Sequence, residues 1–226
     1  MTKYLRYSVL PCLLAVCLML LLTGTGCKSA EDEAVSMPVS MIEVKDGIDS
    51  MSTEDFTECE ETTEFVKLTV TGYGDIILRL QSSVAPLTAA HFASLVAEGY
   101  YDGLTFHRVY KDLLIQGGRG ASTSTVKGEF SDNGVANHLS HVRGMLSMAH
   151  DYAYDSATSE FFICHGDATF LDGSYAVFGY VIAGMDTVDK IADAPVEPQP
   201  DMGGEISLPQ EQIVIQKACF VKPKSA

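Results

Sequence analysis

The sequence predicts a mainly β domain, a barrel or sandwich capped by helices, over residues 63–222. Three observations predict this class. Short runs of alternating apolar and polar residues recur along the segment, as expected for strands with one buried face. Glycine and other turn-forming residues separate these runs. Only the stretches 85–99 and 184–194 carry the pattern of a helix, so two helices accompany many short strands.

The elements follow one another in a simple order. A hairpin is predicted over residues 64–80, with Gly72 and Gly74 in its turn. The helix over 85–99 has Pro86 in its first turn, where proline is favoured. Further strands are predicted in 105–118, which forms a second hairpin, and in 144–149, 159–165, 175–182 and 211–221.

The first 27 residues are interpreted as a signal peptide that ends at a lipidation cysteine. A short basic start precedes the apolar run 7–22, which is short for a membrane span and typical of a signal-peptide core. The "TGTGC" that ends at Cys27 resembles a bacterial lipoprotein processing site, although Gly24 stands where a leucine-like residue is usual. We therefore expect an extracytoplasmic lipoprotein anchored to the membrane. A secreted protein, or one with an uncleaved anchor, remains the alternative.

Residues 28–62 are strongly acidic and show no persistent period. Eleven Asp and Glu residues stand against two lysines, which is typical of a disordered tether. The alternative is that residues 54–62 add an edge to the domain. The whole chain has a formal net charge of −15, which argues against nucleic acid as a partner because such binding needs a basic face. We expect a monomer.

The cysteines and histidines indicate neither a metal site nor thiol chemistry. Outside the N-terminal segment only Cys59, Cys164 and Cys219 remain, and no CxxC occurs. Buried free thiols are expected for Cys164 and Cys219, which lie in apolar strands. His138 and His141 have no carboxylate or cysteine at ligand spacing. No metal and no cofactor are therefore expected.

The stretch "TFHRVYKDLLIQGG" (105–118) places polar groups on an apolar sheet. Strand alternation puts Phe106 and Arg108 on one face, and Leu114 and Gln116 on one face after the turn. If the two runs pair, a single sheet face carries a guanidinium, an amide and a leucine. Such a mixed face is a plausible binding groove.

The same alternation applies to "SEFFICH" (159–165). It places Glu160 and Phe162 on one face, and Phe161 and Ile163 on the core side. An aromatic ring and a carboxylate thus share one face of the strand, although core packing remains the alternative for the ring.

Four segments in this order resemble the cyclophilins, which are peptidyl-prolyl cis-trans isomerases. They are "FHRVYKDLLIQGG", "GMLSMA", "SEFFICH" and "FLDGSYAVFGYVIAGMDTVDKI". The resemblance covers residues 63–222 and is nearest to compact bacterial members. It implies a closed eight-stranded antiparallel β-barrel capped by two α-helices. It also implies a groove on the outside of the barrel for proline-containing polypeptides.

The resemblance also implies roles for individual residues. Arg108 matches the catalytic arginine, Gln116 the glutamine that orients it and contacts the substrate backbone, and Phe162 the floor of the proline pocket. Ala149 matches a residue whose backbone contacts substrate. The other substrate-binding candidates are Phe106, Leu113, Leu114, His150, Glu160, Phe170, Leu171 and Tyr175.

Several candidates depart from the family pattern. Leu113 replaces a pocket phenylalanine, and Leu114 replaces a methionine. Phe170 replaces the tryptophan of eukaryotic members, which suggests weak cyclosporin binding. Glu160 replaces a glutamine and adds charge to the groove wall. Tyr175 replaces a histidine and His150 an asparagine.

Catalysis of this reaction needs no nucleophile. Rotation about an X–Pro bond breaks amide conjugation, with a barrier of about 18–20 kcal/mol. A fixed donor aimed at the pyramidal prolyl nitrogen favours the twisted state over both planar isomers. We therefore expect an isomerase that acts on exported or surface proteins. The alternative is a membrane-tethered proline-peptide binding module with weak catalysis, for which Leu113 and Glu160 are the best support.

Overall fold

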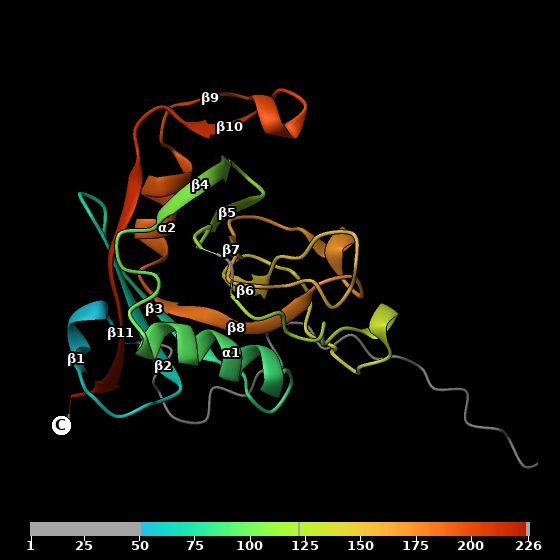
Figure 1. Cartoon of the computed structure of the whole chain (residues 1–226). Helices are drawn as coiled ribbons and strands as arrows, with labels where there is room; N and C mark the ends of the chain where they lie inside the picture. The colour runs from blue at the N-terminus through green and yellow to red at the C-terminus, as the bar shows by residue number, and fades with distance from the viewer. Residues whose placement is uncertain (1–50, 122, 225–226) are drawn as a thin grey trace, which may run out of the picture. The chain divides into compact units, whose positions relative to one another are not determined.

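Eight antiparallel strands close into a barrel in the computed structural model, which describes residues 51–121 and 123–224 (Figure 1). Around the barrel the order is β2-β3-β8-β6-β7-β5-β4-β11, and β11 pairs with both β2 and β4. The strands are β2 (Phe65–Val70), β3 (Gly74–Leu80), β4 (Thr105–Tyr110), β5 (Leu114–Gly117), β6 (Met145–Met148), β7 (Phe161–Cys164), β8 (Ala176–Ala183) and β11 (Ile213–Pro223). The predicted closed eight-stranded barrel with two helices is confirmed.

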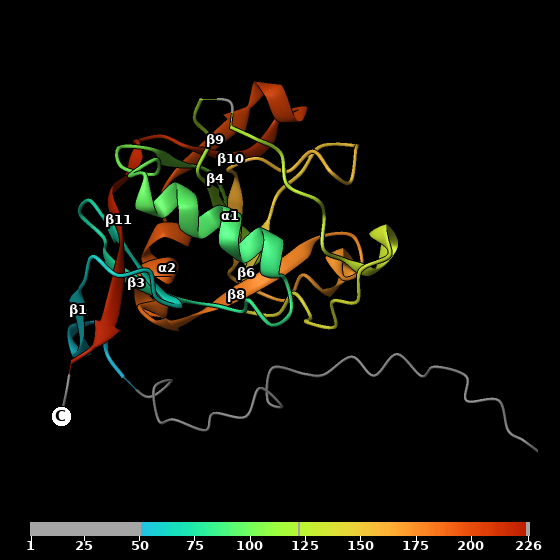
Figure 2. The same ribbon diagram turned by 60° about the horizontal axis from the view of Figure 1, so that its bottom comes forward.

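Two α-helices pack against the strands, α1 (Pro86–Ala97) and α2 (Met185–Ala192) (Figure 2). Phe92 of α1 and Val188 and Ile191 of α2 are completely buried in the barrel interior. The described residues also form four single turns of 3-10 helix: η3 (Thr53–Asp55), η4 (Ser131–Asn133), η5 (Thr169–Leu171) and η6 (Pro200–Met202).

Strand alternation divides the apolar side chains into two clusters. Phe161 and Ile163 of β7 point into the barrel interior, where Phe161 packs edge-on against Phe92. Phe162 and Cys164 point to the other side and join a second buried cluster. The outer face of this part of the barrel is therefore apolar as well, and it can floor a pocket.

Helix α1 begins without a capping side chain at Ala85, and a distant glutamate takes that role. The buried carboxylate of Glu129 accepts hydrogen bonds from the backbone N–H of Leu87 at 3.1 Å and of Thr88 at 2.7 Å. It also accepts one from the Thr88 hydroxyl at 2.7 Å. A negative charge at this end of a helix is stabilising, because the helix presents unpaired N–H groups there.

Replacing Glu129 with alanine is expected to lower the free energy of unfolding by about 2–3 kcal/mol, because buried donors lose their acceptor. Chemical denaturation of both proteins measures this difference. Glu98→Ala is the control, since Glu98 is exposed at the other end of the same helix. Equal stabilities for the two variants would contradict the capping role.

The domain begins earlier than residue 63. Strand β1 (Phe56–Glu58) follows η3 and pairs with the end of β11, where Phe56 lies opposite Pro223. The predicted disordered tether over 28–62 is therefore wrong for residues 53–58, and the alternative of an added edge describes them. Phe56 is buried against Phe65, which explains why this segment is ordered despite its charge.

Residues 28–50, and the predicted signal peptide with its lipidation site at Cys27, lie outside the described residues. Within 51–121 and 123–224, no helix combines the length and the apolar character that crossing a membrane requires.

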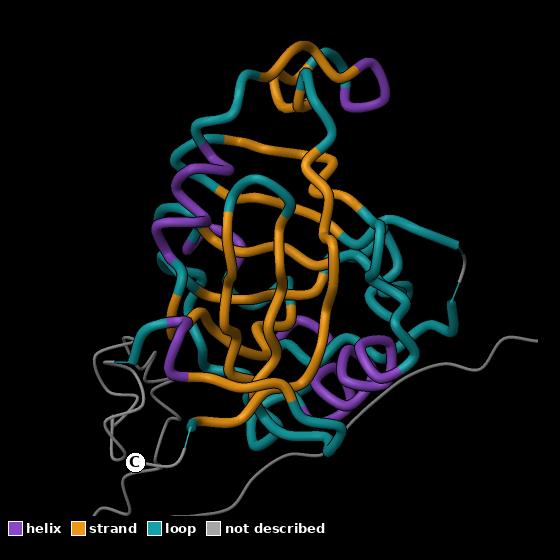
Figure 3. Tube along the Cα trace, turned by 90° about the vertical axis from the view of Figure 1, so that its left-hand side faces the viewer, coloured by secondary structure: helices purple, strands orange, loops and turns teal. Residues whose placement is uncertain are grey.

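A small hairpin between α2 and β11 was not predicted. Strands β9 (Val196–Gln199) and β10 (Glu205–Pro209) pair with each other and not with the barrel sheet. Figure 3 shows this hairpin extending beyond one end of the barrel. Its sequence hides it, because Ile206 is 63% exposed while Ser207 is fully buried. In this strand the apolar residue faces solvent and the polar residue is buried, which is the reverse of the usual strand pattern.

Candidate active site

One row of residues crosses three neighbouring strands on the outer face of the barrel. Arg108 of β4 lies opposite Gln116 of β5, and Gln116 lies opposite Phe162 of β7. Residues paired directly across antiparallel strands have Cβ atoms about 4.5–5.5 Å apart. The sheet register itself therefore places a guanidinium, an amide and a phenyl ring side by side.

The position of Phe106 corrects the sequence prediction. Phe106 is paired with Gly117 and Arg108 with Gln116, so His107 is an extra residue, a β-bulge. The bulge turns Phe106 into the barrel interior, where it is 1% exposed. Strict alternation had placed Phe106 beside Arg108 as a substrate contact, and this is wrong. Gly117 suits this position, because an added Cβ would lie only 3.0 Å from the Phe106 ring.

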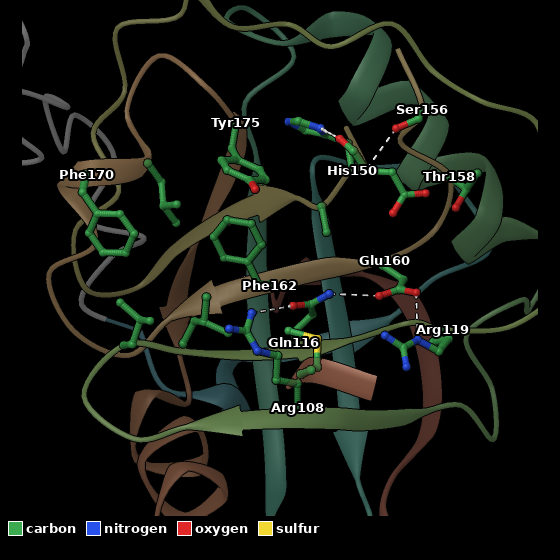
Figure 4. Close-up of a pocket in the computed structure, with 16 residues that line it drawn as sticks. Arg108, Gln116, Arg119, His150, Ser156, Thr158, Glu160, Phe162, Phe170 and Tyr175 are labelled. Carbon is green, nitrogen blue, oxygen red and sulfur yellow. Dashed lines mark hydrogen bonds and ion pairs between the residues drawn. The ribbon is translucent and has the colours of Figure 1, made fainter. Parts of the chain in front are cut away.

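A pocket of about 420 Å³ opens over this row (Figure 4). It brings together the predicted residues Arg108, Leu113, Leu114, Gln116, Ala149, His150, Glu160, Phe162, Phe170, Leu171 and Tyr175. Phe106 is the one predicted residue that it leaves out. Five further residues line it that the sequence did not indicate, namely Arg119, Asp151, Ser156, Thr158 and Met202.

Arg108 is held by partners on two sides. Its Nη1 donates to Oε1 of Gln116 at 3.2 Å. Its Nε and Nη2 donate to the two carboxylate oxygens of Glu205, at 2.7 and 2.8 Å. The hydrogen bonds from Arg108 to Glu205 outweigh burial and raise the pKa of the guanidinium above its usual value. Arg108 is therefore a permanently charged donor at every physiological pH.

Glu160 continues the chain of polar contacts along the pocket wall. Its Oε2 accepts from Nε2 of Gln116 and its Oε1 from Nε of Arg119, both at 2.9 Å. Burial opposes ionisation of this carboxyl, but His107 and Arg119 outweigh it and lower the pKa of Glu160 to about 2. Nε2 of His107 lies 3.2 Å from Oε2, although it is poorly aligned for a hydrogen bond. Glu160 therefore stays ionised at neutral pH.

Phe162 packs against His141, whose ring is held by the buried Ser147 on one side and the exposed Asp172 on the other. The His141 ring stacks on Phe162 with centroids 5.8 Å apart. Nδ1 of His141 lies 2.7 Å from Oδ1 of Asp172, and its Nε2 lies 2.9 Å from Oγ of Ser147. The carboxylate can only accept, so Nδ1 carries the proton and Nε2 accepts from the serine. Burial lowers the pKa of His141, which keeps the ring neutral.

This serine, histidine and aspartate have the hydrogen-bond order of a nucleophilic triad. His141 and Ser147 are nevertheless completely buried, so the hydroxyl has no path to a substrate. The cluster instead fixes the ring that floors the pocket. Tyr175 packs edge-on against Phe162 at 5.9 Å and stacks on His150 at 4.5 Å.

The described cysteines do not form a thiol centre. Cys59, Cys164 and Cys219 are all free, and burial raises the pKa of Cys164 to about 12. Cys164 is buried as expected, whereas Cys219 is only partly buried. Among the described residues, no three His, Cys, Asp or Glu side chains are grouped as metal ligands.

Glu205 and Met202 were missed for the same reason. Both belong to the β9–β10 hairpin, which lies about a hundred residues after Arg108 along the chain. No local pattern marks a residue whose partner is so distant. Arg119 and Ser156 lie in loops, where side-chain periodicity gives no prediction.

Comparisons with known proteins identify the family. The family model for cyclophilin type peptidyl-prolyl cis-trans isomerases matches residues 65–218. Peptidyl-prolyl cis-trans isomerase A of Dickeya dadantii is 39% identical over 173 residues, which are 71% of this chain and 87% of that protein. A peptidyl-prolyl cis-trans isomerase of Acinetobacter baylyi is 44% identical over 137 residues, which are 55% of this chain and 70% of that protein.

A solved structure of the same family has a similar fold. The cyclophilin type isomerase of Cryptosporidium parvum, crystallised in the presence of the dipeptide Ala-Pro, has a TM-score of 0.60 and 27% identity, over 69% of this chain and 98% of that one. The barrel, the pocket and the relatives all indicate the same family. The chain therefore belongs to the cyclophilin family and is a peptidyl-prolyl cis-trans isomerase.

Proposed function

We propose that the pocket binds a proline-containing segment of an exported or surface polypeptide, with Arg108 donating a hydrogen bond to the prolyl nitrogen as the amide twists. Twisting breaks conjugation and gives that nitrogen a lone pair, which the planar isomers lack. A donor fixed at this point stabilises the twisted state more than either ground state, and this difference is catalysis.

The fixed guanidinium beside an apolar floor is the observation that carries this proposal. Arg108 has five N–H donors, and three of them are used by Gln116 and Glu205. Two remain for a substrate. Phe162, Leu114 and Leu171 provide the apolar surface next to them, where a proline ring can be buried.

Gln116 has a double role in this proposal. Its Oε1 accepts from Arg108 while its Nε2 donates to Glu160, so both ends of the amide are oriented by hydrogen bonds. Ala149 and His150 line the same pocket, and the Ala149 backbone and the His150 side chain are proposed to contact the peptide on either side of the proline. No bond is made or broken, so no step requires a cofactor.

A proline-isomerisation assay tests the proposal against the rival of a weakly catalytic binding module. Rapid exchange of an X–Pro peptide in the presence of wild-type protein supports the enzyme. Peptide binding with exchange near the uncatalysed rate, tens of seconds or longer, supports the rival. The decisive variant replaces Arg108, the proposed donor.

Replacing Glu160 with glutamine is expected to change peptide preference. The ionised carboxylate adds a negative charge to the groove wall, which favours peptides with a basic residue near the proline. A charge interaction at this exposure is worth about 1 kcal/mol, so the kcat/KM ratio between a lysine-containing and a neutral peptide should fall about fivefold. Glu60→Gln, an equal change at an exposed edge position, is the control. Unchanged activity on every peptide pair would rule the idea out.

We further propose that the protein is a monomeric lipoprotein whose isomerase domain is held at an extracytoplasmic membrane surface. The apolar run 7–22 followed by Cys27 supports this anchor. Mass spectrometry of the mature N-terminus tests it. A chain that begins at a diacylated Cys27 supports the proposal, and an unmodified or uncleaved N-terminus contradicts it.

A further inference from the structure

Glu205 of the β9–β10 hairpin contacts the row formed by Arg108, Gln116 and Phe162. Glu205 is the first residue of β10, and its two carboxylate oxygens face Nε and Nη2 of Arg108 at 2.7 and 2.8 Å. This is the parallel, two-point geometry in which a carboxylate matches a guanidinium. The side chains are only 17% and 22% exposed, so solvent screens the pair less than a surface ion pair.

The two-point contact restrains the arginine in a way that one hydrogen bond could not. A single bond leaves the guanidinium plane free to rotate about the bond axis. Two parallel bonds to Glu205 fix that plane, and the bond from Nη1 to Gln116 fixes its far edge. The two remaining N–H groups, one on Nη1 and one on Nη2, are therefore held in fixed directions.

The hairpin is built to hold Glu205 in place. The buried Ser207 hydroxyl lies 3.1 Å from Oε1 of Gln199 across the hairpin, and the Gly204 N–H donates to the Gln199 carbonyl at 3.0 Å. The hydrogen bonds from Arg108 lower the pKa of the Glu205 carboxyl. The carboxylate is therefore ionised at neutral pH. Arg108 binds it directly, and hydrogen bonds across the hairpin hold the backbone that carries it.

A carboxylate beside the catalytic arginine has two opposite effects. It fixes the donor, and it also offsets part of the guanidinium charge. The twisted prolyl amide carries a new lone pair but no net charge, so hydrogen-bond direction matters more than total charge at this step. Misplacing a reacting group by 1 Å can cost about a hundredfold in rate. Orientation is therefore the larger effect.

We propose that Glu205 is a positioning residue for the isomerase reaction, which fixes the plane of the Arg108 guanidinium so that its free N–H groups face the prolyl nitrogen. The proposal rests on the role of Arg108 proposed above. It makes the β9–β10 hairpin a working part of the site, although the hairpin lies outside the barrel sheet. Met202 of the neighbouring η6 turn lines the same pocket.

The test compares Glu205→Ala, Glu205→Gln and Glu197→Ala in the full chain. Glu197 is exposed on β9 of the same hairpin and is the matched control. We expect Glu205→Ala to lower kcat about tenfold while KM changes less than twofold, since Gln116 still holds one edge of the arginine. The kcat of Glu205→Gln should lie between those of wild type and Glu205→Ala, because an amide oxygen can accept only one of the two arginine hydrogen bonds. Glu197→Ala should match wild type.

A spectroscopic measurement separates positioning from mere stability. The ¹⁵N–¹H signal of Arg108 Nε, assigned by its loss in Arg108→Ala, should exchange slowly with water in wild type and rapidly in Glu205→Ala. An unchanged signal, an unchanged or increased kcat, or a loss of activity that only follows the unfolded fraction would each overturn the proposal. If Arg108→Ala itself remains active, the proposed function fails, whereas a loss in Arg108→Ala without one in Glu205→Ala overturns this inference alone.

Discussion

Replacing Arg108 with alanine is expected to lower kcat/KM for X–Pro isomerisation by about 10²–10³-fold, the usual loss when one preorganised donor is removed from an active site. Arg108 is the charged donor at one end of the row, and it is already oriented by Gln116 and Glu205. Proline exchange followed by a protease-coupled assay or by NMR measures the loss. Peptide affinity should change far less, because the apolar floor remains.

Two further variants sharpen this experiment. Arg108→Lys keeps the charge but not the planar fork, so it should lose most of the activity if geometry matters. Arg143→Ala is the control, since Arg143 is exposed and pairs with Asp189 on α2. Activity that survives in Arg108→Ala, or that falls equally in Arg143→Ala, would contradict the assignment of Arg108 as the donor.

Replacing Phe162 with alanine is expected to lower kcat/KM by about 30- to 150-fold. Phe162 is buried in the outer cluster and forms the pocket floor, so its loss removes the apolar contact for a proline ring. An apolar contact of this size is worth about 2–3 kcal/mol, and the loss should appear mainly in KM. The cavity should also lower the free energy of unfolding by about 3–5 kcal/mol.

Phe178→Ala is the matched control for this second experiment. Phe178 is equally buried, but it packs in the barrel interior against Phe92 and not in the pocket. Denaturation curves should show similar destabilisation of both variants. Assayed at a temperature where both are folded, Phe178→Ala should keep its activity while Phe162→Ala should not. Equal activities would mean that Phe162 acts only as a core residue.

The alternation of side chains predicted most of the site, because side-chain period is a local property of a strand. Glu160, Phe162, Leu114 and Gln116 all lie on the face that this rule assigns, with Phe161 and Ile163 inside. The rule failed at Phe106, where the bulge at His107 interrupts the period. Nothing in the residue types of 105–110 marks the bulge, which depends on pairing with β5.

Long-range partners could not be predicted in the same way. Glu205 meets Arg108 across 97 positions of sequence, on a hairpin whose exposed isoleucine and buried serine invert the usual pattern. Phe56 was assigned to a tether because the charge of 54–61 dominates its surroundings. Phe56 instead lies in a strand because this segment pairs with β11, and that contact too is distant in sequence.

The single extra residue in β4 determines which side chains of the strand face the barrel interior and which face outward. Counting from Phe106 in strict steps of two, Arg108 would point into the hydrophobic interior, where an unpaired guanidinium is too costly to bury. One inserted position reverses inside and outside for everything that follows it on the strand. Arg108 thus faces the pocket, although it stands only two positions after the inward-facing Phe106. A change in chain length by one at this point would therefore matter more than many changes of residue type.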